Sequence, residues 1–452
     1  MPRILLALLL LAALPAAAQE IHLPVQLHHL ANGLRVVTLE EHAAPVAVVQ
    51  IWYHVGSKDE VAGRTGLAHL LEHNMFNGTH AHPPGTFSRL VAKAGGDDNA
   101  FTSFDYTAYY EKFAADRLTL GLELEADRMR NLLLTEKEFD RERQVVKEER
   151  RMRTEDNPES ALVEQVRAAA FVAHPYGRPV IGWMEDIDRL TVDDLKRFYE
   201  RYYRPDNATL VVVGDFDTAT LLPEVKRIFG PIEAPPSEGR RTFSEPTQRG
   251  ERRVTLRRPA KLPFLYAAFP APTFDHADGP ALEVAAQLLA GGKSARLNRS
   301  LVETQRLCLY AGAGYDGDAE DPSLFTLYAA LQPGHTPEEA EAALEAEVAR
   351  LAGEPIGAAE LAKAKTQLEA GFVFAQDSPF YLAMTLGRLY TTGHTVADLE
   401  AYLPRIRAVT AADVQRVVAT YLQRDRRTLG VLIPEAGKAP PVRPPQTSGV
   451  VR

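Results

Sequence analysis

The chain has 452 residues, a length that suits two sizeable domains better than one. Its formal net charge at pH 7 is −9, and basic residues are interleaved with acids, which argues against a nucleic-acid-binding surface. The single cysteine, Cys308, excludes an internal disulfide, so packing must supply the stability.

The first 18 residues have the features of a secretory signal peptide. One basic residue, Arg3, precedes an apolar run at residues 4–14, and small residues at 16–18 provide a cleavage site. We expect cleavage after Ala18 and a periplasmic destination; a retained N-terminal anchor is the alternative. The apolar run is short for a membrane span, and no later segment reaches the length that a span needs.

The next part of the chain predicts alternating strands and helices. An Asn-Gly pair at residues 32–33 predicts a β-hairpin turn, and apolar runs predict strands near residues 46–55 and 101–113. Helical spacing of apolar residues predicts helices near residues 67–76 and 117–134. This mixture favours helices packed on a largely antiparallel sheet, an α+β fold.

Two distant segments match without a gap, which indicates an internal duplication. Residues 190–213 and 409–432 align at a constant offset, and each combines a Thr-x-x-Asp capping pattern with a helix and a buried strand. Two capped helices could match by chance, but the match continues through the strand.

Pro and charged residues concentrate between the two copies and predict a linker there. The expected units are a signal peptide, a first lobe, a linker, a homologous second lobe and a flexible tail. Their bounds are residues 1–18, 19–233, 234–250, 251–435 and 436–452.

The motif HLLEH, at residues 69–73, has the spacing of a helical metal site. On a helix, His69 and His73 lie one turn apart on the same face, and Glu72 can reach a water on an ion held between them. Two structural histidines are the alternative. The apolar neighbours of the motif weaken that alternative, because burying two imidazoles and a carboxylate without a partner is costly.

Zinc with an open catalytic position needs a third protein ligand, and a predicted helix beginning after Thr135 supplies candidates. Glu142 and Glu149 lie two turns apart on an otherwise apolar face of that helix. The other members of that face are Phe139, Val145, Val146 and Met152. A cation would compensate the two carboxylates, and so would nearby arginines; periodicity alone favours neither.

At these residues the chain resembles a known family. HLLEH followed by ERQVVKEE is similar to the inverted zinc motif of the pitrilysin and insulinase metallopeptidases, in particular their mitochondrial-processing-peptidase-like branch. The resemblance extends through GGDDNAFTSFDYTAYY, at residues 95–110, and HPYGRPVIG, at residues 174–182. It therefore covers nearly all of the first lobe, whereas the second lobe is similar in pattern and less so in motif.

The resemblance implies one zinc ion per chain, bound by His69, His73 and Glu149. Glu72 is then the general base for the attacking water, and Glu142 matches the supporting acid of the same helix. The implied activity is that of a zinc-dependent endopeptidase that hydrolyses peptides or unfolded segments. The alternative is a non-catalytic assembly or peptide-binding subunit of a larger complex, for which the base would be unnecessary.

The resemblance also implies that the substrate adds as a strand to a sheet edge near Asn99, Ala100 and Phe101. This mode of binding favours extended peptides, because the backbone edge must be free to pair. For Asn99, a turn residue after GGDD is the alternative interpretation.

Relatives of this kind work as two homologous halves that close around a chamber. The half without zinc contributes an arginine and a tyrosine in a stretch like L-R-x-x-x-G-x-x-Y, and here the matching positions hold Val302 and Leu309. Arg306 and Tyr310 are out of register, and a transition-state donor must be aimed accurately. We therefore expect a heterodimer with a homologous zinc-free subunit that carries the Arg/Tyr pair; a homodimer that uses Tyr310 is the alternative.

Overall fold

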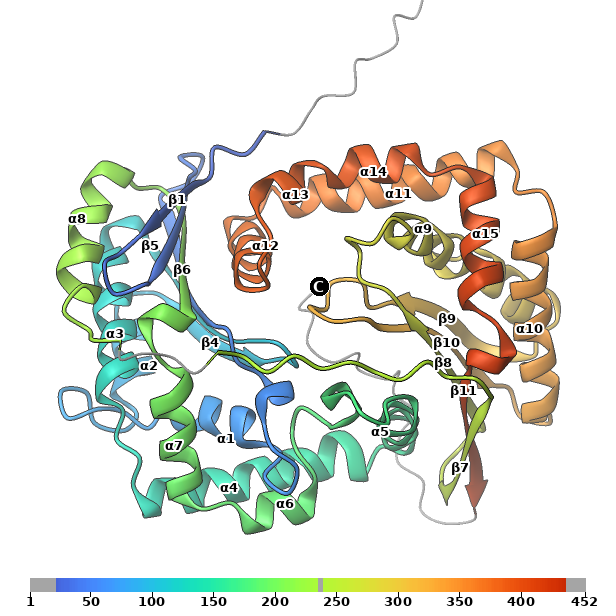
Figure 1. Cartoon of the computed structure of the whole chain (residues 1–452), viewed down its shortest axis with the longest axis horizontal. Coiled ribbons are helices and arrows are strands. Elements are labelled where there is room, and N and C mark those ends of the chain that lie inside the picture. The colour runs from blue at the N-terminus through green and yellow to red at the C-terminus, as the bar shows by residue number, and fades with distance from the viewer. Residues whose placement is uncertain (1–21, 235–238, 436–452) are drawn as a thin grey trace, which may run out of the picture.

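The computed structural model describes residues 22–234 and 239–435, which form two sheets with helices packed on them (Figure 1). The expected signal peptide and tail lie outside these residues, as do residues 235–238 of the expected linker. Within the described ranges, no helix is both long and apolar enough to cross a membrane. The architecture is the α+β class predicted from the sequence.

The two sheets have the same strand order, which confirms two homologous lobes. The first sheet runs β1-β2-β6-β3-β5-β4 and the second runs β7-β11-β8-β10-β9, so the second repeats the order of the first without an equivalent of β1. In each, one parallel pair, β2 with β6 or β7 with β11, joins otherwise antiparallel strands. The first-sheet strands are β1 Gln26–His29, β2 Arg35–Glu40, β3 Val46–Tyr53, β4 Asp97–Thr102, β5 Thr107–Ala114 and β6 Ala208–Gly214. The second-sheet strands are β7 Arg252–Pro259, β8 Phe264–Ala271, β9 Cys308–Tyr315, β10 Ser323–Leu331 and β11 Thr428–Glu435.

Helices follow the strands in both lobes. In the first half of the chain they are α1 Leu67–Asn74, α2 Thr86–Lys93, α3 Leu118–Asn131, α4 Glu136–Arg150, α5 Pro158–Ala170, α6 Met184–Arg189, α7 Val192–Tyr202 and α8 Thr218–Phe229. In the second half they are α9 Gly279–Ala290, α10 Pro337–Gly353, α11 Ala358–Ala375, α12 Pro379–Thr391, α13 Val396–Glu400, α14 Tyr402–Ala408 and α15 Ala411–Tyr421. The repeated capping pattern begins α7 and α15: Thr191 and Asp194 form one capping box, and Thr410 and Asp413 form the other.

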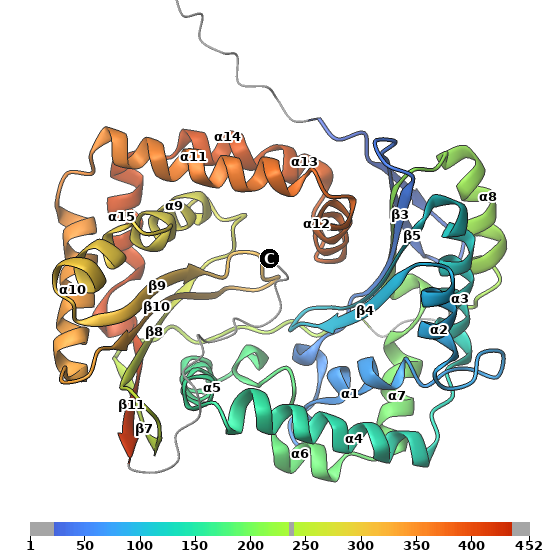
Figure 2. The ribbon, with the colours of Figure 1, turned by 180° about the vertical axis from the view of Figure 1, so that it is seen from behind.

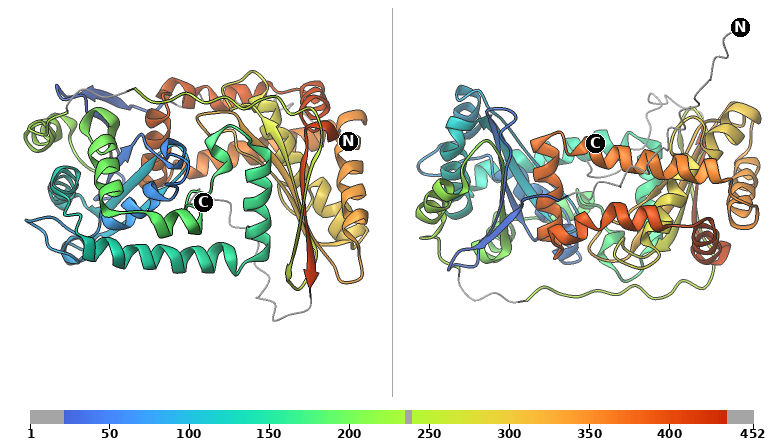
Figure 3. Two further views of the ribbon diagram at one scale, coloured as in Figure 1. Left: turned by 60° about the horizontal axis from the view of Figure 1, so that its bottom comes forward. Right: turned by 90° about the horizontal axis from the view of Figure 1, so that it is seen from above.

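The lobes exchange one helix each across their boundary. Helix α5 of the first half packs on the second sheet, where Leu162 meets Phe264 and Leu432, and α12 of the second half packs on the first sheet, where Leu386 meets Trp52. Figure 1 shows both helices between the two sheets, and Figure 3 shows α4 leading into α5. Each half of the chain therefore completes the core of the other.

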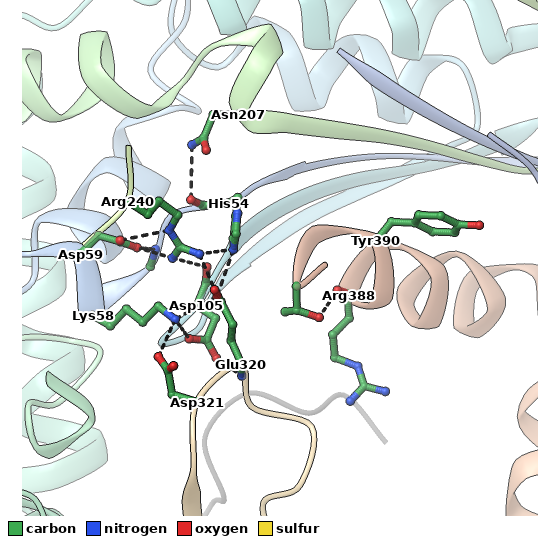
Figure 4. Close-up of polar contacts among 12 residues, drawn as sticks. His54, Lys58, Asp59, Asp105, Asn207, Arg240, Glu320, Asp321, Arg388 and Tyr390 are labelled. Carbon is green, nitrogen blue, oxygen red and sulfur yellow. Dashed lines mark hydrogen bonds and ion pairs between the residues drawn. The ribbon is translucent and has the colours of Figure 1, made fainter. Parts of the chain in front are cut away.

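A buried polar cluster also joins the lobes (Figure 4). Lys58, in the turn η1 (Ser57–Asp59), lies 2.8 Å from Asp105 of the first lobe, 2.9 Å from Glu320 and 3.0 Å from Asp321 of the second. Arg240, in the described part of the expected linker, pairs with Asp59 and Glu320. Because the Lys58 side chain is only 3% exposed, these contacts hold one lobe against the other with little screening by solvent.

The strand expected at residues 101–113 is instead a hairpin. β4 ends at Thr102, the Ser103 amide donates to the Tyr106 carbonyl at 2.8 Å, and β5 begins at Thr107. The turn contains no Gly, Pro or Asn that would have marked it in the sequence. As a result β4 is an edge strand, and it lies beside α1.

Candidate metal centre

The two elements that carry the motif residues lie side by side. The apolar side of α1, with Leu67, Leu70 and Leu71 buried, packs into the core of the first lobe, while α4 lies alongside α1 (Figure 2). Thr135 caps α4 by accepting from the Glu138 amide. This packing directs the remaining side of α1 toward α4.

On α4 the buried face is narrower than the sequence suggested. Phe139 and Val146 are buried, and the half-buried Glu142 and Glu149 lie on the side that faces α1. Val145 and Met152, which were expected on the same face, are 46% and 67% exposed. The buried face of α4 therefore consists of two pairs of residues seven apart, Phe139 with Val146 and Glu142 with Glu149. Val145, which is adjacent to Val146 in the sequence, already faces solvent.

Three predicted ligands converge at one point. The Nε2 atoms of His69 and His73 lie 3.7 and 3.3 Å from Oε2 of Glu149, and all three atoms lie within 4.8 Å of one another. This is the single such group of His, Cys, Asp or Glu residues among the described parts of the chain. Ligand atoms at about 2.0–2.2 Å from a tetrahedral zinc ion lie roughly 3.3–3.6 Å apart, so the two separations from Glu149 are close to those that this ion requires.

The charges in this group also suit a cation. Burial and the neighbouring His73 lower the pKa of His69 to about 4, which keeps its imidazole neutral. Burial opposes charge on His73 too, but hydrogen bonds to Glu142 and Glu149 outweigh it and raise the pKa of His73 to about 9. The same contact lowers the pKa of Glu149 to about 2 despite its burial. Without a metal, a proton on His73 thus supplies the positive charge that the carboxylates require.

Glu72 is held beside this group by a residue that the sequence did not single out. The Thr102 hydroxyl, at the end of β4, donates to Oε2 of Glu72 at 2.5 Å. Burial raises the pKa of Glu72 to about 7, and the hydrogen bond from Thr102 opposes that rise. A carboxyl group poised near neutral pH can exchange a proton with a reacting water.

Glu142 contacts the other nitrogen of a predicted ligand. Its Oε2 lies 3.5 Å from Nδ1 of His73, and its Oε1 accepts from Arg141 at 3.0 Å. Glu149 pairs in addition with Arg153 at 2.8 Å. The sequence left two ways to compensate the carboxylates of Glu142 and Glu149, a cation or nearby arginines. The arginines are present, and they contact the same two carboxylates that lie beside the predicted histidine ligands.

The predicted substrate strand is placed beside the motif helix, but its side chains alternate. β4 pairs only with β5, so its other edge is free of strand partners. Ala100 packs toward the core under α1, whereas Phe101 packs on the opposite face against Trp52, with ring centroids 5.3 Å apart. Asn99 contacts the backbone amide of Ala100 at 2.9 Å. Of the three predicted residues, only Ala100 thus has its side chain on the metal side of the strand.

The second lobe has no comparable group among its described residues. Val302 packs against the second core, and Leu309 is 45% exposed on the edge strand β9. The Tyr310 hydroxyl donates to Glu159 of α5 at 2.6 Å, so it is engaged within the chain. Arg306 has a φ of 52°, in the left-handed region that favours the glycine of the related stretch.

Two family models match successive parts of the chain. The family model described as Insulinase (Peptidase family M16) matches residues 35–183, and the model described as Peptidase M16 inactive domain matches residues 189–368. The zinc protease PqqE of Helicobacter pylori is 34% identical over 90% of this chain and 92% of its own length. A zinc protease of Mycobacterium leprae is 32% identical over 90% and 92%.

Solved structures show the same fold. The crystal structure of a protease from Helicobacter pylori matches with a TM-score of 0.88 and 33% identity, over 91% of this chain and 100% of that one. The periplasmic protease PqqL of Escherichia coli matches with a TM-score of 0.76 and 20% identity; the match covers 92% of this chain and 48% of that one. Both lobes are thus accounted for, and the chain belongs to the insulinase family of zinc peptidases, peptidase family M16.

Proposed function

We propose that this chain is a zinc-dependent endopeptidase that hydrolyses peptides or unfolded segments. The observation that carries the proposal is the convergence of His69, His73 and Glu149 with a half-buried carboxylate, Glu72, beside them. In this proposal the first three residues hold one zinc ion per chain. Glu142 fixes the orientation of the His73 ring through Nδ1, a role that outer carboxylates commonly play for metal-bound histidines.

When bound, zinc would polarise the scissile carbonyl and lower the pKa of water at the site to about 7. Glu72 takes the proton of that water as attack occurs and delivers it to the leaving amine. Thr102 holds the Glu72 carboxylate in place through its hydroxyl. The sequence did not predict Thr102, but its position two residues after Ala100 puts it on the same face of β4.

Substrate binding is proposed at the free edge of β4. A peptide in extended form would add as a further strand beyond β4, with its backbone groups paired to that edge. Because Ala100 faces the metal side and Phe101 faces away from it, a bound peptide would contact mainly the backbone of β4 and one small side chain. Such contacts support broad acceptance of substrate side chains.

A homologous zinc-free subunit is proposed as the partner. Val302 and Leu309 supply no polar group, and the hydroxyl of Tyr310 is committed to Glu159. These contacts favour a heterodimer over a homodimer that uses Tyr310. Export to the periplasm is proposed from residues 1–18, which lie outside the described structure.

The test is peptide hydrolysis by the purified chain, alone and mixed with a homologous subunit that carries the Arg/Tyr pair. Glu72→Gln should retain zinc and lose hydrolysis, because the amide cannot take a proton. Activity confined to the mixture supports the heterodimer. Activity of the chain alone contradicts the partner proposal, and full activity of Glu72→Gln contradicts the assignment of the base. Bound zinc without hydrolysis in every mixture would favour a non-catalytic assembly subunit.

A further inference from the structure

The helix that carries the motif begins without a capping side chain of its own. Its N-cap is Gly66, with φ of 89°, and no side chain of that residue can cap the helix. A Cβ atom at this position would lie 2.7 Å from the Ile181 carbonyl oxygen, so the position requires glycine. The amides of the first turn therefore need an acceptor from elsewhere.

Glu60 supplies that acceptor. Its two carboxylate oxygens accept from the amides of Gly66 and Ala68, each at 2.8 Å, and its side chain is buried. A carboxylate at a helix N-terminus is also favoured by the helix dipole. Burial raises the pKa of Glu60 to about 8, while the two amide hydrogen bonds and Arg178 favour the anion.

The capped turn contains a proposed metal ligand. His69 directly follows Ala68, and it lies in the first turn of a helix of only eight residues. Fraying of that turn would displace His69 directly and would move Glu72 and His73 with it. Within residues 22–234 and 239–435, no side chain other than that of Glu60 accepts from the amides of Gly66 and Ala68.

Glu60 itself is fixed from both sides. It follows Lys58 and Asp59, which belong to the interlobe cluster, and the Arg178 guanidinium donates to its carbonyl at 3.0 Å. The cap is therefore anchored to a rigid part of the molecule, as an outer group that orients metal ligands must be.

We propose that Glu60 is a positioning residue for the metal site, which holds the first turn of α1 so that His69 stays aimed at the ion. This role rests on the proposed zinc site. It assigns to Glu60 an effect on zinc affinity, separate from any general effect on stability.

The test compares zinc dissociation constants, measured by competition with a chelating dye, for the full chain and its variants. Glu60→Gln replaces one acceptor with an NH₂ group that faces an amide donor, and we expect zinc affinity to fall about 10- to 100-fold. Glu60→Asp keeps the charge but is one carbon shorter, and we expect a smaller loss. Glu347→Gln is the control: Glu347 is a buried carboxylate on α10 that pairs with Arg350, and its loss should leave zinc affinity unchanged.

A second measurement does not depend on the folding of a variant. In the zinc-free wild-type chain, the amides of Gly66 and Ala68 should be protected from hydrogen exchange, although neither has an acceptor within α1. Unprotected exchange at both amides overturns the proposal. So does wild-type zinc affinity in folded Glu60→Gln or Glu60→Asp.

The failure of this role is distinct from the failure of the zinc site. If the wild-type chain binds no zinc, or if His73→Ala leaves zinc affinity unchanged, the zinc site itself is wrong. If zinc binding depends on His73 and Glu60→Gln does not alter it, only the role of Glu60 is wrong.

Discussion

The two lobes share a strand order but differ in the helix that follows β3 in the first lobe and its counterpart β8 in the second. In the first lobe this helix is α1, which carries the HLLEH motif; in the second lobe it is α9, whose buried residues include Leu282, Ala285 and Leu288. The fold is thus compatible with either set of residues on this helix, the polar motif of α1 or the apolar residues of α9. Its stability does not require the proposed metal ligands, which bring the cost of buried polar groups.

Helices α4 and α11 hold corresponding places in the two lobes and differ in the same way. Counted from the N-caps Thr135 and Gly357, the positions of Glu142 and Glu149 on α4 correspond to Ala364 and Gly371 on α11. The second lobe therefore lacks both halves of the donor set. One scaffold thus holds the proposed donor set in the first lobe and apolar or small residues at the corresponding positions of the second.

Removal of zinc should affect the two lobes unequally, and this is the largest expected effect. A ligand at a thousand times its dissociation constant stabilises the folded state by about 4 kcal/mol. Chelation should accelerate hydrogen exchange in α1 and α4 and leave α9 and α11 unchanged. Equal acceleration in both lobes would contradict a metal site confined to the first.

Replacing a buried leucine of α5 or α12 with alanine should destabilise the lobe on whose sheet that helix packs. Leu162→Ala on α5 and Leu386→Ala on α12 each remove a fully buried side chain, at a cost of about 2–5 kcal/mol. Urea unfolding measures the loss, and hydrogen exchange locates it. Leu162→Ala should speed hydrogen exchange in the second sheet, and Leu386→Ala should speed it in the first. The reverse pattern would contradict the packing of α5 on the second sheet and of α12 on the first.

Removal of the Thr102 hydroxyl should slow catalysis and spare zinc binding. Thr102→Val keeps the shape of the side chain but leaves Glu72 without its hydrogen bond, which is worth about 1–2 kcal/mol and hence roughly a tenfold fall in kcat. Zinc content and KM should stay close to those of the wild type.

Thr326→Val, at a strand position of the second sheet, is the matched control. Its hydroxyl contacts the Gly314 carbonyl at 3.4 Å and the Tyr266 side chain, both in the second lobe, so kcat should not change. A wild-type kcat in Thr102→Val would exclude the positioning of Glu72 by Thr102.

The smallest expected effect is a pH dependence that arises in the second lobe. Burial, with Asp318 acting in the same direction, raises the pKa of Glu283 to about 7, against the hydrogen bond from Tyr402. The folded state therefore binds this proton more tightly than the unfolded chain does. The resulting stability is fully present below the ordinary glutamate pKa of 4.5 and is lost as pH rises through about 7.

Urea unfolding at several pH values checks this dependence. Glu283→Gln cannot titrate, so the free energy of unfolding of the wild type relative to the variant should fall between about pH 5 and 8. A constant difference across that range would show that the pKa of Glu283 is not raised in the folded state.

The sequence predicted those features that depend on local spacing. The repeated Thr-x-x-Asp pattern at Thr191 and Thr410 predicted the duplication, and helical periodicity placed His69, Glu72 and His73 on one turn of a helix. These predictions succeed because helix geometry fixes the relation between neighbouring residues.

Features that depend on tertiary placement were missed. An apolar face on α5 or α12 shows that the helix is buried but not on which sheet it packs. Glu60 and Thr102 reach α1 from a turn and from a strand end, so no spacing in the sequence relates them to it. The hairpin at residues 103–106 was missed because its turn holds no Gly, Pro or Asn, and the turn residues that it does hold, Ser103 and Asp105, were interpreted as part of one strand.

The most direct test of the account is the number of zinc ions bound per chain in the wild type, Glu149→Gln and Glu148→Gln. Glu148 is the neighbour of Glu149 on α4, and its side chain is 64% exposed and paired with Arg151. We expect one tightly bound zinc ion in the wild type and in Glu148→Gln, and loss of tight binding in Glu149→Gln. Tight zinc binding that survives in Glu149→Gln, or that is lost in Glu148→Gln, would contradict it.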